Sequence, residues 1–133
     1  MFMILLGNPV TKKNSQRLVT IGGHPRILQS KRFLEYQASC LEQIRYMYRD
    51  LQPVREGSTM VCVYHRQDNR RCDLSNLMEA TQDILVEAGV LPDDGHKYLR
   101  RIVAQWGEID KANPRVEITI VTVEGEEHDQ ECV

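Results

Sequence analysis

The chain lacks any apolar run that approaches the roughly 20 residues needed to span a membrane. Residues Met1 to Leu6 are apolar, but neither a basic leader nor a small-residue cleavage site accompanies them, so they do not have the pattern of a signal peptide. These absences exclude a membrane span and a secretory leader as explanations of the apolar segments. We therefore expect a cytoplasmic protein with no membrane partner.

Several familiar motifs are also absent. The four cysteines (Cys40, Cys62, Cys72 and Cys132) are widely spaced with no Cys-x-x-Cys pair, which argues against a zinc site. Cys40 and Cys62 lie in apolar surroundings and are expected to be buried thiols. The chain has no glycine-rich phosphate loop, Ser-His-Asp order or dinucleotide fingerprint, so we expect no nucleotide cofactor.

Length and charge point to one domain with an acidic tail. At 133 residues the chain is long enough for one hydrophobic core. The last ten residues carry five acids and no Lys or Arg, and the other 123 residues hold 17 basic and 14 acidic side chains, a formal charge of +3. We expect a domain over residues 1–123 and a disordered tail over 124–133. The mildly basic body permits nucleic-acid binding without requiring it.

Periodicity predicts an α/β (α+β) domain, in which a mixed sheet packs against two main helices. Helical spacing indicates one helix from about Lys31 to Asp50, with Ser30 as its N-cap, and a second from Leu74 to Ala88, ended by Gly89. Short apolar or alternating runs predict strands at Phe2–Leu6, Leu18–Ile21, Arg26–Leu28, Thr59–His65, Lys97–Glu108 and Val116–Val123.

Carboxylates gather around the second helix. Asp73 precedes it and is either a helix N-cap or part of a functional cluster. Glu79 and Asp83 share one face of that helix with Asn76, and Asp93-Asp94 follows in the next loop. Because carboxylates repel one another, such a cluster usually needs a cation or basic partners. Spacing alone does not decide whether the later loop returns to Asp73.

Hard cations such as Mg²⁺ bind through one or two carboxylates together with water and substrate phosphate. Such a site needs basic groups to hold the phosphates, and three basic clusters are present. Lys12-Lys13 lies in the first loop. Arg66, Arg70 and Arg71 precede Asp73, and Lys97, Arg100 and Arg101 follow the paired acids. Solvated surface charge is the better explanation of any one of these residues, but the three clusters together favour phosphate binding.

As a set, these motifs resemble the RusA-type Holliday junction resolvases (crossover junction endodeoxyribonucleases), small metal-dependent DNA endonucleases common in prophages and bacteria. The family pattern has an arginine-rich lead, Asp-x-Asp-Asn-Leu-x-Lys, a further helical Asp and then an Asp-Asp pair. The matching residues here are Arg70, Arg71, Asp73, Asn76, Leu77, Asp83, Asp93 and Asp94. Pro9 to Asn14, Ser30 with Tyr36, and Arg115 to Ile120 extend the resemblance from Ile4 to about Ile120.

The sequence departs from the family pattern at two motif positions. Ser75 stands where the pattern has its second Asp, and Glu79 stands where it has Lys. Glu79 could restore the lost carboxylate on the face that carries Asn76 and Asp83, with Ser75 as a supporting donor or cap. The alternative is a degraded metal site in a protein that binds branched DNA without cutting it.

The resemblance implies a homodimer that binds four-way DNA and nicks two opposed strands in DNA recombination and repair, with Mg²⁺ or Mn²⁺ as cofactor. It implies Asp73 and Asp94 as the principal metal ligands, and Asp93 and Asp83 as supporting ligands or catalytic groups. We expect Glu79, which replaces the motif Lys, to join them as a ligand or catalytic group. Ser75 and Asn76 would support these ligands by hydrogen bonds. The DNA-binding residues it implies are Lys12, Lys13, Asn14, Arg70, Arg71 and Lys97. A third interpretation, a small interaction module with an acidic face, involves neither DNA nor metal.

Overall fold

The computed structural model of the protein describes residues 1–12, 17–28, 30–93, 95 and 97–122. The elements in chain order are β1 (Phe2–Leu6), β2 (Arg17–Ile21), β3 (His24–Leu28), α1 (Lys31–Met47), β4 (Ser58–His65), α2 (Leu74–Glu87), β5 (Leu99–Trp106) and β6 (Arg115–Thr122). The predicted mixed sheet with two main helices is confirmed, and the element boundaries differ from the predicted ones by at most three residues.

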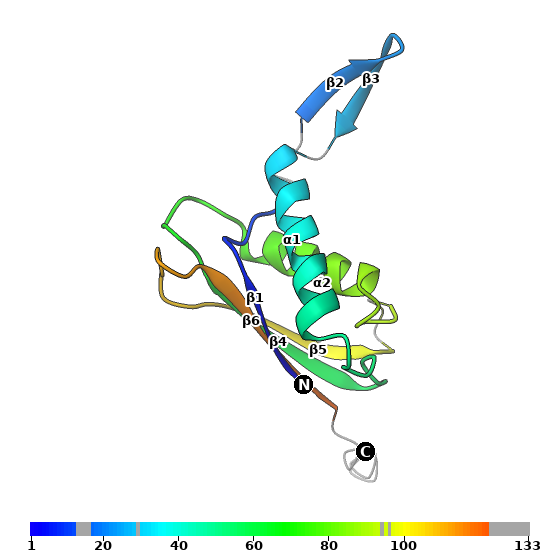
Figure 1. The fold of residues 1–133 in the computed structure, drawn as a ribbon, viewed down its shortest axis with the longest axis vertical. Coiled ribbons are helices and arrows are strands. Elements are labelled where there is room, and N and C mark those ends of the chain that lie inside the picture. The colour runs from blue at the N-terminus through cyan, green and yellow to red at the C-terminus, as the bar shows by residue number, and fades with distance from the viewer. Residues whose placement is uncertain (13–16, 29, 94, 96, 123–133) are drawn as a thin grey trace.

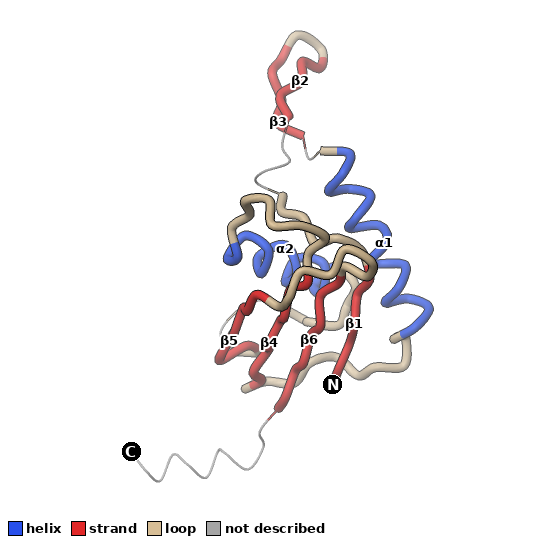
Figure 2. The backbone as a smooth tube through the Cα atoms, turned by 90° about the vertical axis from the view of Figure 1, so that its left-hand side faces the viewer, coloured by secondary structure: helices blue, strands red, loops and turns tan. Residues whose placement is uncertain are grey.

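Four strands form the main sheet in the order β1-β6-β4-β5. β6 pairs antiparallel with both β1 and β4, whereas β4 and β5 are parallel and are connected through α2. Both helices cover the same face of this sheet (Figure 1), and in the view turned by 90° α1 runs beside β1 while α2 crosses at the upper ends of the strands (Figure 2). The parallel pair matters most for the site, because it brings the ends of β4 and β5 together.

The core lies between the sheet and the two helices. Along β4, buried residues alternate with partly exposed ones, and Met60, Cys62 and Tyr64 point into the core. β6 alternates in the same way through Val116 and Ile118. Burial raises the pKa of the Cys40 thiol to about 11 and that of Cys62 to about 12. Both thiols are therefore protonated at neutral pH, as expected of packing residues.

Both helix starts have the expected caps. The Ser30 hydroxyl accepts a hydrogen bond from the Phe33 N–H at 3.1 Å. α1 ends at Met47, short of the expected Asp50, because Tyr48 leaves helical geometry as the C-cap. Gly89 follows α2 with φ of 80°, a left-handed conformation that glycine adopts without steric cost.

The hairpin of β2 and β3 projects beyond the N-terminal end of α1, away from the main sheet (Figures 1 and 2). Its strands pair from Arg17 with Leu28 to Ile21 with His24. Leu18 is 72% exposed, which agrees with a position outside the core. No helix in the described part of the chain has the length and apolarity to cross a membrane. The predicted tail lies outside the described residues.

Tyr64 links the sheet to α2 by a buried hydrogen bond. Its hydroxyl lies 2.8 Å from Oγ1 of Thr81, which itself donates to the Leu77 carbonyl at 2.9 Å. Burial raises the pKa of Tyr64 well above its usual range, with Cys62 adding to the shift, so the hydroxyl is protonated at neutral pH. This hydrogen bond fixes the tyrosine ring at the carboxyl end of β4.

We expect Tyr64→Phe to lower the free energy of unfolding by about 0.5–1.5 kcal/mol, the usual net value of one hydrogen bond. Urea unfolding followed by circular dichroism measures this free energy for both proteins. Tyr46→Phe removes the same atom from a residue that is 67% exposed, and should change stability by less than about 0.5 kcal/mol. Equal losses in the two variants would contradict the role of the Tyr64 hydroxyl.

Candidate functional site

The candidate site lies beyond the carboxyl ends of β4 and β5. Because these strands are parallel, both chains leave the sheet at the same edge, and Tyr64 is the register partner of Trp106. Register partners in a parallel pair face the same side of the sheet, so both rings lie on the side covered by the helices. Ligands of open α/β sheets commonly bind at such strand ends.

Arg66 organises the loop that follows β4. Its guanidinium donates to the carbonyl of Arg70 at 2.7 Å and to that of Pro9 at 3.4 Å, and the side chain is buried. The Arg66 carbonyl accepts from the Asp110 N–H at 2.9 Å. The loops after β1, β4 and β5 are therefore held together around one buried cation.

The ends of β4 and β5 and the loops that follow them line a pocket of about 360 Å³, here called the arginine pocket. Its lining includes two aromatic and three basic side chains: Tyr64, Trp106, Arg66, Arg70 and Arg71. Asp68 also lines it and lies 3.7 Å from the exposed guanidinium of Arg70. The pocket therefore combines an aromatic wall with net positive charge.

Asp73 lies beside this pocket as the N-cap of α2. Its Oδ1 accepts from the Ser75 N–H at 2.9 Å, the Ser75 hydroxyl at 2.6 Å and the Asn76 N–H at 3.4 Å. Asp73 and Asn76 line a second, open pocket that shares Arg71 and Cys72 with the arginine pocket. The cap interpretation of Asp73 is confirmed, and the same carboxylate faces the open pocket.

The helix face that follows carries the other predicted acids. Asp83 forms a 2.6 Å ion pair with Lys12, and both side chains are about one-third exposed. The Lys12 ammonium also lies 5.9 Å from the centre of the Phe33 ring. Glu79 is exposed and lies between Asn76 and Asp83 on this face. Lys12 therefore neutralises Asp83. Glu79 lies about one helical turn nearer to Asp73 than Asp83 does.

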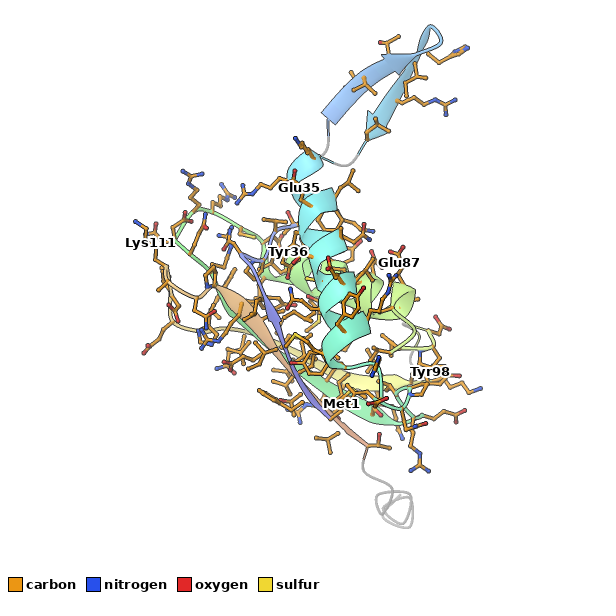
Figure 3. All side chains as sticks on the ribbon, viewed as in Figure 1. Met1, Glu35, Tyr36, Glu87, Tyr98 and Lys111 are labelled. Carbon is orange, nitrogen blue, oxygen red and sulfur yellow. The ribbon has the colours of Figure 1, made fainter. Side chains whose placement is uncertain are left out.

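Asp93 lies at the other end of α2. The helix has 14 residues and, at a rise of about 1.5 Å each, separates Asp73 from the segment of Asp93 by about 20 Å. Lys97 is also at that end, where it pairs with Glu56 at 3.3 Å. In Figure 3, Glu87 and Tyr98, which flank this segment, lie on the opposite side of the molecule from Lys111 in the loop after β5.

The structure thus brings only part of the predicted set together. Asp73, Ser75, Asn76, Arg70 and Arg71 share one surface, whereas Asp93 and Lys97 lie apart from it. The predicted residues Lys13, Asn14 and Asp94 lie outside the described residues, so their roles stay predictions.

The donors around Asp73 suit a hard cation. Within the described ranges no three His, Cys, Asp or Glu side chains form a metal-binding group. Burial raises the pKa of the neighbouring Cys72 thiol, although Arg66 opposes the shift, and a protonated thiol is a poor ligand. The carboxylate of Asp73 and the amide oxygen of Asn76 are oxygen donors of the kind that Mg²⁺ and Mn²⁺ prefer. A metal ion here would take water and substrate phosphate as its further ligands.

Comparison with known proteins gives no assignment: no protein-family model matches the chain, and a search of curated proteins finds no match. The RusA-type resemblance therefore remains an interpretation of the motifs.

Sequence patterns did not identify Trp106 as a candidate functional residue. An aromatic residue on a strand is more often a packing residue, yet Trp106 is 46% exposed and lines the arginine pocket. Its position depends on the parallel register of β4 and β5, which no local pattern specifies. Ile109, in the loop after β5, is 55% exposed and lines the same pocket. No local pattern indicated its position there either.

Gly107 fixes the course of the loop at the pocket edge. A Cβ atom at this position would clash with the His65 ring, well inside van der Waals contact. His65 in turn is held by the Glu108 carbonyl, 2.8 Å from its Nδ1. Gly107 therefore permits the close approach of the loop to the end of β4.

We expect Gly107→Ala to destabilise the protein by about 1–3 kcal/mol, as overpacking does. The test is a double-mutant cycle by chemical denaturation. The same substitution should cost clearly less in a His65→Ala background, where the ring is absent. An equal cost in both backgrounds would show that the His65 contact is not the cause.

Proposed function

We propose that the protein is a metal-dependent endonuclease that acts on branched DNA. The observation that carries the proposal is the continuity of the two pockets. Arg71 and Cys72 belong to both, so a basic surface suited to phosphates runs directly to the carboxylate of Asp73. Phosphate binding beside an oxygen ligand is the arrangement that phosphodiester hydrolysis by a divalent metal requires.

In this mechanism each residue has a separate task. Arg70 and Arg71 bind the DNA backbone and orient a phosphodiester toward Asp73. Ser75 holds Oδ1 of Asp73 through its hydroxyl and N–H, which fixes the carboxylate in one orientation. Asp73, with Asn76 and Glu79, would hold Mg²⁺ or Mn²⁺, which supplies a polarised phosphoryl oxygen and an activated water when bound.

The four-way junction as substrate and the homodimer as active form are proposals drawn from the motif resemblance.

Lys12 is less suited to a direct phosphate contact than Arg71, because its ammonium is paired with Asp83 at 2.6 Å. The proposed DNA surface is therefore centred on the loop from Arg66 to Asp73.

A second candidate is a protein that binds branched DNA without cutting it. The position of Asp93 favours it, because the described carboxylates that the resemblance would bring together lie at opposite ends of α2. The basic and aromatic groups of the arginine pocket would serve this function unchanged. Metal-dependent cutting of a synthetic junction distinguishes the two candidates.

Asp73→Asn should abolish Mn²⁺-dependent cutting of a four-way junction while sparing binding. Asn caps helices about as well as Asp, so the fold is retained while the charge that holds the metal is removed. The loss of cutting rate should exceed the roughly 10- to 100-fold typical of groups that only support a ligand. Asp50→Asn, an exposed acid after α1, is the matched control and should cut normally. Retained cutting by Asp73→Asn would refute the assignment.

Glu79→Gln and Asp93→Asn then identify the second acid. If Glu79 replaces the missing carboxylate of the motif, Glu79→Gln weakens Mn²⁺ binding in calorimetry and Asp93→Asn does not. The opposite result would assign the ligand to Asp93, which in this geometry would have to come from a second copy of the chain.

Arg71→Ala should weaken DNA binding and lower the slope of log affinity against log salt concentration by about one, the effect of losing one phosphate contact. Gel-shift titrations at several salt concentrations measure that slope. Arg49→Ala removes an equal charge at the C-terminal end of α1 and should leave the slope unchanged. Equal slopes in the two variants would place the DNA elsewhere.

A further inference from the structure

Trp106 presents an aromatic surface that the protein core does not use. It lies at the end of the edge strand β5, is 46% exposed and lines the arginine pocket. Its register partner Tyr64 is fully buried and is held by Thr81 at 2.8 Å. One aromatic ring is thus locked in the core while its neighbour in the same lining remains accessible.

The charge around this aromatic surface is positive. Arg66 is only 8% exposed, and its two hydrogen bonds end on backbone carbonyls, which are neutral acceptors. Neither of these two contacts brings a negative charge to the largely buried guanidinium. The more exposed Arg70 and Arg71 line the same pocket. An accessible aromatic face beside several arginines suits a ligand with both a planar ring and a phosphate.

Hydrogen bonds hold the loops of the arginine pocket in place, and the pocket adjoins the open pocket of Asp73. Arg66 ties the loops of Pro9, Arg70 and Asp110 together, so the cavity does not depend on a ligand to form. Through Arg71 it adjoins the open pocket of Asp73. A nucleotide in the arginine pocket would therefore place its neighbouring phosphate toward Asp73.

We propose that the arginine pocket binds one unpaired nucleobase of DNA, which stacks on Trp106 while Arg70 and Arg71 bind the flanking phosphates. The inference rests on the proposed function and adds to it a preference for DNA with unpaired bases next to the phosphate at Asp73. Base pairs in a duplex are stacked on each other and cannot enter such a pocket, whereas bases at a branch point can leave the stack.

The test uses the intrinsic fluorescence of Trp106, which is the only tryptophan in the chain. Two probes are titrated into the full-length protein: a short oligothymidylate, and an oligomer of equal length made of abasic sugar-phosphate units. The two carry the same phosphates and differ only in their bases. The oligothymidylate should change the Trp106 fluorescence and bind more tightly, and the abasic oligomer should bind weakly with little change.

Trp106→Ala should weaken oligothymidylate binding by roughly 5- to 100-fold, the usual effect of losing one stacking ring, and should leave abasic binding unchanged. Anisotropy of labelled probes measures both affinities. Trp106→Phe keeps a ring on the strand and should retain part of the preference for bases, which guards against a folding defect in the alanine variant.

Equal binding of the two probes by the native protein, or an unchanged preference in Trp106→Ala, overturns the inference. Junction cutting is measured separately. Cutting without a base preference refutes the base pocket alone, whereas a base preference without cutting refutes the nuclease alone.

Discussion

The parallel pairing of β4 with β5 is the constraint on which the site depends. It places Trp106 beside Tyr64, and it makes the loops after both strands leave the sheet at one edge. The buried guanidinium of Arg66 then joins the loop after β4 to the segment after β1, and the Arg66 carbonyl joins it to the loop after β5. The pairing of β4 with β5 and the contacts of Arg66 thus hold three loops next to one another on one surface. The positions of the arginines and of Asp73 follow from these two features.

Asp73 combines two electrostatic roles. Its carboxylate accepts hydrogen bonds from backbone N–H groups at the start of α2, where the helix dipole favours negative charge. The same interaction holds the anion at the edge of an open, arginine-lined surface. The hydrogen bonds that cap the helix therefore also orient the Asp73 carboxylate. In the proposed site Asp73 is the central acid, because Asp83 is paired with Lys12 and Asp93 is remote.

Local sequence patterns were sufficient to predict the helices and strands, but not to predict which side chains meet at the candidate site. Alternation predicted β4 and β6, and capping chemistry at Ser30, Asp73 and Gly89 predicted where helices begin and end, because these signals act between near neighbours. The cap at Tyr48 and the exposure of Trp106 depend on tertiary packing and strand register. The separation of Asp93 from Asp73 has the same origin: a helix that connects parallel strands must span the sheet, so residues at its two ends diverge.

The hairpin of β2 and β3 extends away from the sheet, and its exposed Leu18 lies outside the core. Changes in its length or composition would therefore leave the folding energetics of the sheet and helices almost untouched. Such an appendage can diverge rapidly in sequence while the domain that carries it stays the same. Related chains would accordingly differ most in this hairpin and least in the segment from β4 to β5.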